Sequence, residues 1–326
     1  MALPVGICPT RRYRPFSTFL RERFGGRVHR LALDGGFTCP NVDGTVTTGG
    51  CVFCDNESFS PNRRIHLKDI AAQVARGIAI VGKRFRVERF LAYFQAGTNT
   101  HARLEKLQRT YDAALAEPRV VGLSLATRPD SLPEPVLNLL DGYRQRTFVG
   151  LEIGLQSMHE RSLVWMNRGH DVASFVDAVA RCEGRGFDLC VHVILGLPGE
   201  THDDMLATAD FLAGFPIDGV KIHNLHVVRD TPLEGMYARG EVRMLERDEY
   251  VNLTCDFLER LPAHLVVHRL TGDAPPDHLI APAWCADKNS LLLDISAELV
   301  RRDSWQGKET RPIGRSRIGR RALPLV

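Results

Sequence analysis

The sequence predicts an α/β fold: a partial (β/α)6 TIM-like barrel with N- and C-terminal extensions. Short runs rich in β-branched and apolar residues alternate with longer segments of helical periodicity. This alternation is typical of successive βα units around a parallel sheet. At 326 residues the chain is long enough to bury the core of one large barrel. We find neither an internal repeat nor a low-complexity linker that would divide it.

The expected elements follow one another along the whole chain. The expected strands are Val28–Asp34, Phe90–Gln95, Val120–Ala126, Thr147–Gly154, Leu189–Leu195, Val220–Val227 and Leu265–Leu270. Helical patterns lie near residues 67–83, 103–116, 133–142, 172–185, 202–213, 247–260 and 287–302. These elements predict a barrel over residues 28–230, a basic extension over 1–27, a strand and helix extension over 231–302, and a basic, flexible tail over 303–326.

The composition is that of an ordinary globular protein. Hydrophobic residues make up 44% of the chain and charged residues 25%. No apolar stretch approaches the roughly 18 residues that would indicate a membrane span, and the N-terminus lacks the apolar core of a signal peptide. We therefore expect a cytoplasmic protein with no membrane partner.

Positive charge is concentrated near the two ends. The formal net charge is only +3, yet residues 11–30 hold seven arginines against one glutamate, Glu22. The segment from Lys308 to Arg321 holds six basic residues against Glu309. Arginine at this density suits a polyanion, because the guanidinium fork matches phosphate oxygens. The simpler interpretation is a solvated surface and a disordered tail.

The cysteines point to metal chemistry. Without a secretory signal, eight cysteines indicate reduced thiols or metal ligation more than disulfides. Three of them, Cys39, Cys51 and Cys54, lie in a sixteen-residue window with the spacing C-x11-C-x2-C. The window directly follows the first expected strand. It therefore belongs to the C-terminal face of the barrel, where barrel enzymes place their active sites.

Three thiolates can hold three irons of a cubane and leave the fourth iron open. Iron–sulfur clusters are usually held by four thiolates, so an incomplete set leaves room for a small chelating ligand. The glycines of the loop allow the backbone to wrap a bulky inorganic core. The alternative is a structural zinc site with His66 or Cys8 as the fourth ligand. A second C-x-x-C or C-x-x-H pair, which zinc sites usually contain, is missing.

The segment from His29 to Cys54, HRLALDGGFTCPNVDGTVTTGGCVFC, resembles radical S-adenosylmethionine (radical SAM) proteins. More narrowly, it resembles a bacterial subfamily related to the catalytic subunit of the Elongator complex. The resemblance spans residues 24–290 through YFQAGTNT, GLSLATRPD, LEIGLQS, NRGHD, ILGLPGET, VKIHNLHVV and APAWC. It implies a [4Fe–4S] cluster on Cys39, Cys51 and Cys54, S-adenosylmethionine as cofactor, and an electron donor of the flavodoxin or ferredoxin type.

The resemblance also implies a cofactor cradle at the ends of the strands. The residues expected to contact S-adenosylmethionine are Gln95, Thr127, Arg128, Glu152, Gln156, Gly196, Pro198 and His226. His223 and Cys285 are candidate catalytic residues, Cys285 as a radical relay or hydrogen donor. Each position also has a simpler interpretation. A lone barrel histidine is more often a hydrogen-bonded structural group, and an isolated cysteine is more often a small buried hydrophobe.

The substrate expectation rests on the Elongator likeness and the arginine-rich N-terminus. We expect a radical SAM enzyme that acts on the side chain of a modified wobble uridine in transfer RNA. One alternative is a radical oxidoreductase of a small molecule such as a porphyrinogen. The other is a non-enzymatic, zinc-stabilised RNA-binding module.

Overall fold

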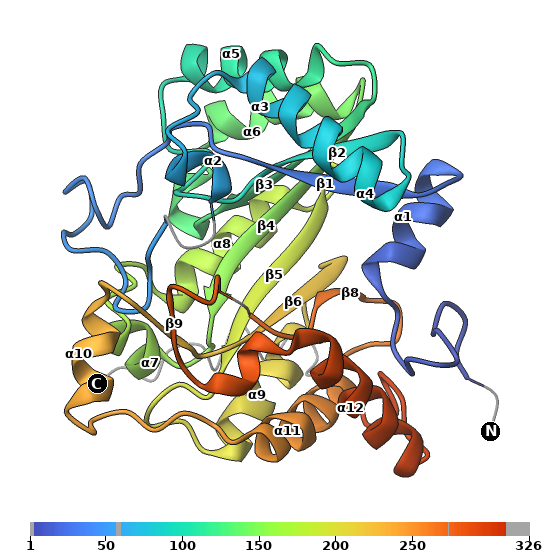
Figure 1. Ribbon diagram of the computed structural model, residues 1–326, viewed down its shortest axis with the longest axis vertical. Coiled ribbons are helices and arrows are strands. Elements are labelled where there is room, and N and C mark those ends of the chain that lie inside the picture. The colour runs from blue at the N-terminus through green and yellow to red at the C-terminus, as the bar shows by residue number, and fades with distance from the viewer. Residues whose placement is uncertain (1–2, 57–59, 273, 311–326) are drawn as a thin grey trace.

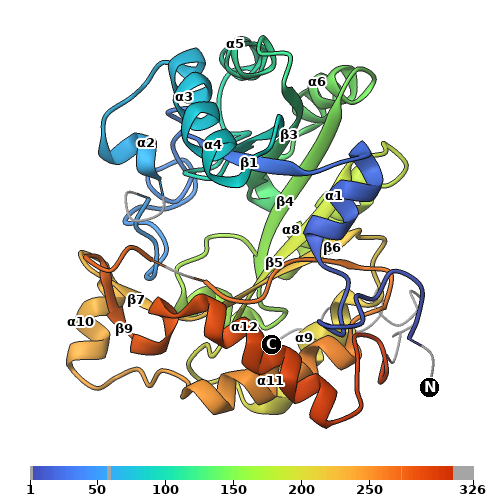
Figure 2. The ribbon, with the colours of Figure 1, turned by 45° about the vertical axis from the view of Figure 1, so that its right-hand side comes forward.

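The computed structural model of the protein describes residues 3–56, 60–272 and 274–310. Seven parallel strands, in the order β1-β2-β3-β4-β5-β6-β8, curl into a half-barrel with helices on its outer side (Figures 1 and 2). The expected partial barrel is thereby confirmed. The seven strands are β1 (Val28–Leu33), β2 (Arg89–Phe94), β3 (Val120–Thr127), β4 (Phe148–Gln156), β5 (Asp188–Leu195), β6 (Gly219–Asn224) and β8 (Val266–Arg269).

The helices connect the strands. They are α1 (Phe16–Phe24), α2 (Pro61–Arg64), α3 (Ile70–Gly77), α4 (Lys83–Phe85), α5 (Leu104–Leu115), α6 (Glu134–Arg144), α7 (Glu160–Trp165), α8 (Val172–Cys182), α9 (His202–Leu212), α10 (Pro232–Ala238), α11 (Arg247–Arg260) and α12 (Lys288–Arg301). Within the described part of the chain, none of them is both long enough and apolar enough to cross a lipid bilayer.

The central strand β4 shows why the sequence forms this sheet. Leu151, Ile153 and Leu155 are fully buried in the hydrophobic core, while Glu152 and Gly154 between them line a cavity on the inner side. This period of two sends apolar side chains towards the helices and polar ones into the barrel. The inner side of this half-barrel is therefore unusually polar, since barrel interiors are mostly filled with branched apolar residues.

One expected strand is two elements in the structure. Where the sequence predicted a single strand over Val220–Val227, β6 ends at Asn224. A separate strand, β7 (Val227–Val228), pairs antiparallel with β9 (Leu279–Ala281). The Asn224 side chain explains the break. Its amide oxygen accepts from the backbone N–H of Gly272, and its amide nitrogen donates to Cys285 Sγ at 2.9 Å. These bonds tie the strand end to the C-terminal segment.

Helix α1, inside the expected basic extension, packs where the half-barrel is open. Strands β1 and β8 are the two edges of the sheet. Phe16 and Leu20 of α1 form a small apolar cluster with Val28, Leu91 and Val266 beneath this gap. The sequence prediction missed α1, α2, α7 and α10, because each is too short to show a clear helical period.

The C-terminal segment secures the residues that precede α1. The Gln306 side chain is fully buried. Its oxygen accepts from the backbone N–H of Arg14, and its nitrogen donates to the carbonyls of Pro262 and Leu265. Val267 of β8 donates to the Arg14 carbonyl at 2.8 Å. Residues 311–326 of the expected tail lie outside the described residues.

Asp188, the first residue of β5, lies at the N-terminal end of the barrel with its side chain 11% exposed. Burial, together with the negative charges of Asp218 and Glu152, raises its pKa to about 7. An aspartate whose pKa is higher in the folded state binds more protons there than in the unfolded chain. Stability contributed by the protonated form is therefore present at acid pH and is lost as the pH rises towards and through 7.

We predict that Asp188→Asn removes this loss of stability at high pH. At pH 8 the unfolding free energy of the variant should exceed that of wild type by about 2 kcal/mol, and its melting temperature should be higher. At pH 5 both gains should be smaller. Thermal melts under anaerobic conditions at both pH values measure the difference. Asp203→Asn, at a fully exposed carboxylate, is the matched control and should shift neither melt. Equal shifts of Asp188→Asn at pH 5 and pH 8 would contradict the raised pKa.

Candidate active site

A cavity of about 770 Å³ lies at the C-terminal ends of the strands. This volume is in the range of small-molecule and cofactor sites, roughly 300–1,000 Å³. Its walls come from the loop between β1 and α2 and from the ends of β3, β4, β5, β6 and β8. Of the residues singled out from the sequence, those that line it are Cys39, Cys51, Cys54, Gln95, Thr127, Arg128, Glu152, Gln156, His223 and His226.

Three other predicted residues lie outside the cavity lining. Gly196 and Pro198 form the turn after β5, where Gly196 has a φ of 87° and a Cβ would lie 3.0 Å from Leu245. Cys285 is buried one layer behind the wall, against the amide of Asn224, which does line the cavity. The two candidate zinc ligands, Cys8 and His66, are not among the described residues that line it either.

The loop that carries the cysteines is held by backbone turns and by one asparagine. The N–H of Val42 donates to the Cys39 carbonyl, and the N–H of Cys54 to the Cys51 carbonyl. The amide nitrogen of Asn41 donates to the carbonyls of Asn167 and Arg168, at 2.6 and 2.8 Å. Asn41 is fully buried, so these bonds fix the loop against the turn that follows α7.

That turn needs glycine next to Arg168. Gly169 has a φ of 71°, in the left-handed region, and a Cβ there would lie 2.5 Å from the Asn41 side-chain oxygen. The close approach explains the glycine of the NRGHD segment. It allows the cysteine loop and the turn after α7 to pack in direct contact.

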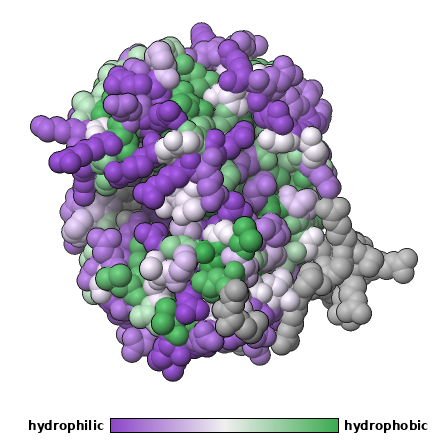
Figure 3. All heavy atoms as spheres, turned by 90° about the vertical axis from the view of Figure 1, so that its right-hand side faces the viewer, coloured by the Kyte–Doolittle hydropathy of each residue, from purple (hydrophilic) through white to green (hydrophobic). Residues whose placement is uncertain are grey.

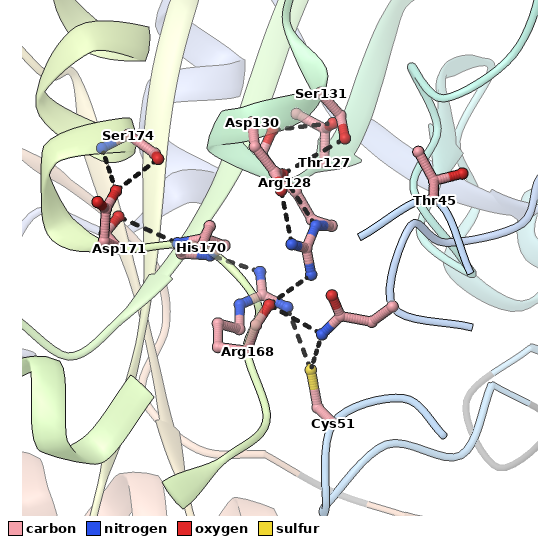
Figure 4. Close-up of polar contacts among 12 residues, drawn as sticks. Thr45, Cys51, Thr127, Arg128, Asp130, Ser131, Arg168, His170, Asp171 and Ser174 are labelled. Carbon is pink, nitrogen blue, oxygen red and sulfur yellow. Dashed lines mark hydrogen bonds and ion pairs between the residues drawn. The ribbon is translucent and has the colours of Figure 1, made fainter. Parts of the chain in front are cut away.

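The Cys51 thiol accepts from two side chains, and Figure 4 shows one of them, Arg168, beside the sulfur. Arg168 donates to Cys51 Sγ at 3.5 Å and to the Gly154 carbonyl at 2.9 Å. Asn41 donates to the same sulfur at 3.6 Å. On the other side, Arg128 donates to the Arg168 carbonyl at 2.7 Å and forms an ion pair with Asp130. Arg168 and Asn41 therefore both point at the sulfur through which Cys51 would ligate a metal.

The three thiols influence one another electrostatically. Burial, followed by the charges of Cys51 and Cys39, raises the pKa of Cys54 to about 12. Without a bound cation the Cys54 thiol therefore resists ionisation beside the other two, and a metal would reverse this because it deprotonates coordinating thiols. The donor set thus fits a positively charged metal centre. The same cavity also presents the Nε2 of His223, a buried atom without a hydrogen-bond partner among the described residues.

Within the described residues, no preformed group of three or more His, Cys, Asp or Glu side chains that could hold a metal ion is found.

Glu152 lies at the centre of a buried polar network. Its carboxylate accepts from Arg30 at 2.8 Å, from Lys221 at 2.7 Å and from the Tyr93 hydroxyl at 2.8 Å. Burial alone would raise its pKa, but the charge of Lys221 and bonds from His192 and His268 hold the pKa well below the ordinary value. Glu152 is therefore an ionised carboxylate that accepts hydrogen bonds from side chains of several strands. It also lines the cavity.

Two histidines beside Glu152 are neutral. The rings of His192 and His223 lie 5.0 Å apart between centroids. Burial lowers the pKa of His192 to about 3, and burial likewise lowers the pKa of His223 well below its ordinary value. At neutral pH these imidazoles can donate or accept hydrogen bonds without adding charge to the cavity. His226 also reaches it, because β6 ends at Asn224 and the alternation of the strand no longer applies.

The sequence profile of the Radical SAM superfamily matches residues 44–212, and that of the Radical_SAM C-terminal domain matches residues 217–301. The chain belongs to the radical SAM superfamily. It is 42% identical to the uncharacterized protein YtqA of Bacillus subtilis over 301 residues, which is 91% of this chain and 92% of that one. Membership in the radical SAM superfamily implies S-adenosylmethionine and a [4Fe–4S] cluster. The three cysteine thiols on the cavity wall are suitable ligands for such a cluster.

More distant likenesses point to Elongator proteins. The chain is 29% identical to Elongator complex protein 3 of Dictyostelium discoideum over 161 residues, covering 48% of this chain and 28% of that one. The structure of the Elp3 protein of Methanocaldococcus infernus superposes with a TM-score of 0.66 at 18% identity. The superposition covers 86% of this chain and 64% of that chain. At this identity it shows a likeness of fold.

Sequence reasoning missed Arg168, which lines the radical SAM cavity, and the residues behind the cavity wall. Asn41 and Arg168 lie inside the segments that carried the family resemblance, CPN and NRGHD. The signal that could have identified them is an asparagine and an arginine in segments that match the family in order. Lys221 and Tyr93 gave a weaker signal: each is a polar residue at an inward position of an otherwise apolar strand.

We predict that Arg168→Leu makes the cluster labile. It removes the charged donor to Cys51 Sγ and the bond to Gly154, and loss of such a supporting contact typically costs about 10- to 100-fold in metal affinity. The decay of visible absorbance under an iron chelator should accelerate about tenfold. Arg161→Leu, at an exposed position of α7, should decay like wild type. An unchanged decay rate in Arg168→Leu would contradict the supporting role.

Proposed function

We propose that this radical SAM enzyme acts on the side chain of a modified wobble uridine in transfer RNA. The observation that carries the radical chemistry is the set of three thiols, Cys39, Cys51 and Cys54, on the wall of one cavity at the C-terminal face of the half-barrel. The transfer-RNA assignment is supported by likeness to relatives named for that chemistry. One is the tRNA uridine(34) acetyltransferase of Methanocaldococcus jannaschii, 27% identical over 53% of this chain and 31% of that one.

The residues fall into separate roles in this proposal. Cys39, Cys51 and Cys54 hold the cluster, while Gln95, Thr127, Arg128, Glu152 and Gln156 contact S-adenosylmethionine along the strand ends. When bound, the reduced cluster and S-adenosylmethionine supply a 5′-deoxyadenosyl radical that abstracts hydrogen from an unactivated carbon. An electron donor of the flavodoxin or ferredoxin type supplies the electron.

The protein itself positions groups and excludes water. Phe53, half-buried between Cys51 and Cys54, covers one side of the cysteine loop. The neutral imidazoles of His192 and His223 offer hydrogen bonds to a substrate without adding charge. A water-poor cavity with fixed polar groups aims a reactive species at one substrate atom and limits side reactions. His223 remains the candidate for direct substrate contact, whereas Cys285 lies behind Asn224.

The cysteine assignment makes a direct prediction. Cys39→Ala, Cys51→Ala and Cys54→Ala should each abolish the brown colour of anaerobically reconstituted protein and its dithionite-dependent formation of 5′-deoxyadenosine. Wild type should carry about four irons and four sulfides per chain. Cys8→Ala, which removes a candidate zinc ligand away from the cavity, is the control and should keep both properties. Colourless wild-type protein with one zinc would overturn the radical assignment.

The substrate assignment is tested in cells. Mass spectrometry of transfer-RNA nucleosides from a deletion strain and its parent should show a wobble-uridine derivative that shifts to its precursor when the gene is absent. A copy carrying Cys8→Ala should restore the parental profile, and one carrying Cys51→Ala should not. Identical profiles in the deletion strain and its parent would favour the small-molecule alternative, such as a porphyrinogen oxidoreductase.

A further inference from the structure

A second hollow lies on the open side of the half-barrel. It is a groove of about 290 Å³ between the two edge strands β1 and β8, bounded by the residues before α1 and by the start of α12. Tyr13 and Phe16 form an aromatic part of its wall. Figure 3 views the molecule from the side where α1 lies, and hydrophilic side chains cover much of that face.

The groove is lined by cationic side chains. Arg11, Arg30, Arg269 and Lys288 contribute to its wall, and no acidic residue is among the described residues that do. Arg30 is held in place by its ion pair with Glu152 and by the rings of Phe16 and Tyr93, 4.7 and 4.8 Å from its guanidinium carbon. Arg11 is exposed at the rim.

Neighbouring residues extend this positive surface. Arg21, Arg23 and Arg27 are exposed on and just after α1. The single acidic residue of this stretch, Glu22, already pairs with Arg14 at 3.3 Å. The positive charges also act on the imidazole of His29 in the groove wall. Burial, followed by the charges of Arg27 and Arg30, lowers its pKa.

One residue separates the groove from the radical SAM cavity. Arg269, at the end of β8, lines both hollows. Arg30 of the groove binds the same carboxylate, Glu152, that faces the cavity. A long ligand in the groove therefore lies one side chain away from the space in which the radical chemistry takes place.

We propose that the groove between β1 and β8 binds the phosphodiester backbone of a polynucleotide substrate and delivers one nucleotide to the cavity. This inference rests on the proposed function and locates its RNA. Lysine and arginine contacts to successive phosphates position a nucleic acid without reading its sequence.

The shape of the surface favours a polymer over a small anion. At about 290 Å³ the groove is at the lower limit of sites that enclose a whole ligand. Positive charge continues outside it on and just after α1, at Arg21, Arg23 and Arg27. A strand of phosphates can use both the groove and the outer arginines, whereas a mononucleotide can use only the groove.

The test measures RNA binding and its salt dependence in the cluster-loaded full chain. A fluorescein-labelled transfer-RNA anticodon stem-loop is titrated at several salt concentrations against Arg11→Gln, Lys288→Gln and the double variant. The matched control is Arg243→Gln/Arg301→Gln, which removes the same charge from two exposed arginines outside both hollows. Melting temperature and visible absorbance establish that the folding and the cluster of each variant match wild type.

The double groove variant should bind about tenfold more weakly. The slope of log affinity against log salt should fall by about 1.4 to 1.8, as expected for two lost phosphate contacts. The control should match wild type in both measurements. Equal affinities and slopes for the groove and control variants, or no binding of the stem-loop by wild type, would overturn the proposal.

Two further outcomes would also overturn it. Displacement of the stem-loop by inorganic pyrophosphate at concentrations comparable to the RNA would identify a small-anion site. Normal RNA binding combined with slowed reduction of the cluster by flavodoxin would assign the groove to an acidic protein donor. Failure of the proposed function is read separately, from the nucleoside profile of the deletion strain, so the two ideas can fail independently.

Discussion

One buried carboxylate is the constraint around which the half-barrel is organised. An ionised group this deep is tolerated only when it is paired and hydrogen-bonded. Glu152 of β4 finds its partners on β1, β2 and β6, through Arg30, Tyr93 and Lys221, with histidines of β5 and β8 nearby. These side chains meet only if the sheet curls, so the network and the curvature require each other. The cavity floor is therefore polar and rigid before any cofactor binds.

The cysteine loop is held in place in a different way. It contains glycines and turns in place of regular structure, so its shape depends on what it is packed against. Asn41 and Arg168 provide that support by joining the loop to the turn after α7. Arg128 braces the same turn from the end of β3. The thiols are consequently positioned by residues far apart in the sequence. The Glu152 network keeps the cavity floor rigid, while the separately supported cysteine loop has room for a bulky inorganic group.

The sequence predicted the fold well because each parallel strand is a short apolar run between clear helical periods. Val120–Ala126 and Leu189–Leu195 fall within one residue of β3 and β5. It also predicted many cavity residues, since strand ends meet at one edge. It failed where side-chain bonds override periodicity, as at Asn224, which ends β6 early. It also missed partners such as Lys221 and Arg168, because a pairing across distant strands leaves no local pattern in one sequence.

The contacts of Gln306 make the placement of α1 depend on a residue 292 positions away from Arg14. The backbone at positions 14 and 15 is held on one side by that side chain and on the other by Val267 of β8. Contacts between residues so distant in sequence carry a large loop-closure cost and form late in folding. We therefore expect the half-barrel to close on its open side only after β8 and the segment that follows α12 have folded.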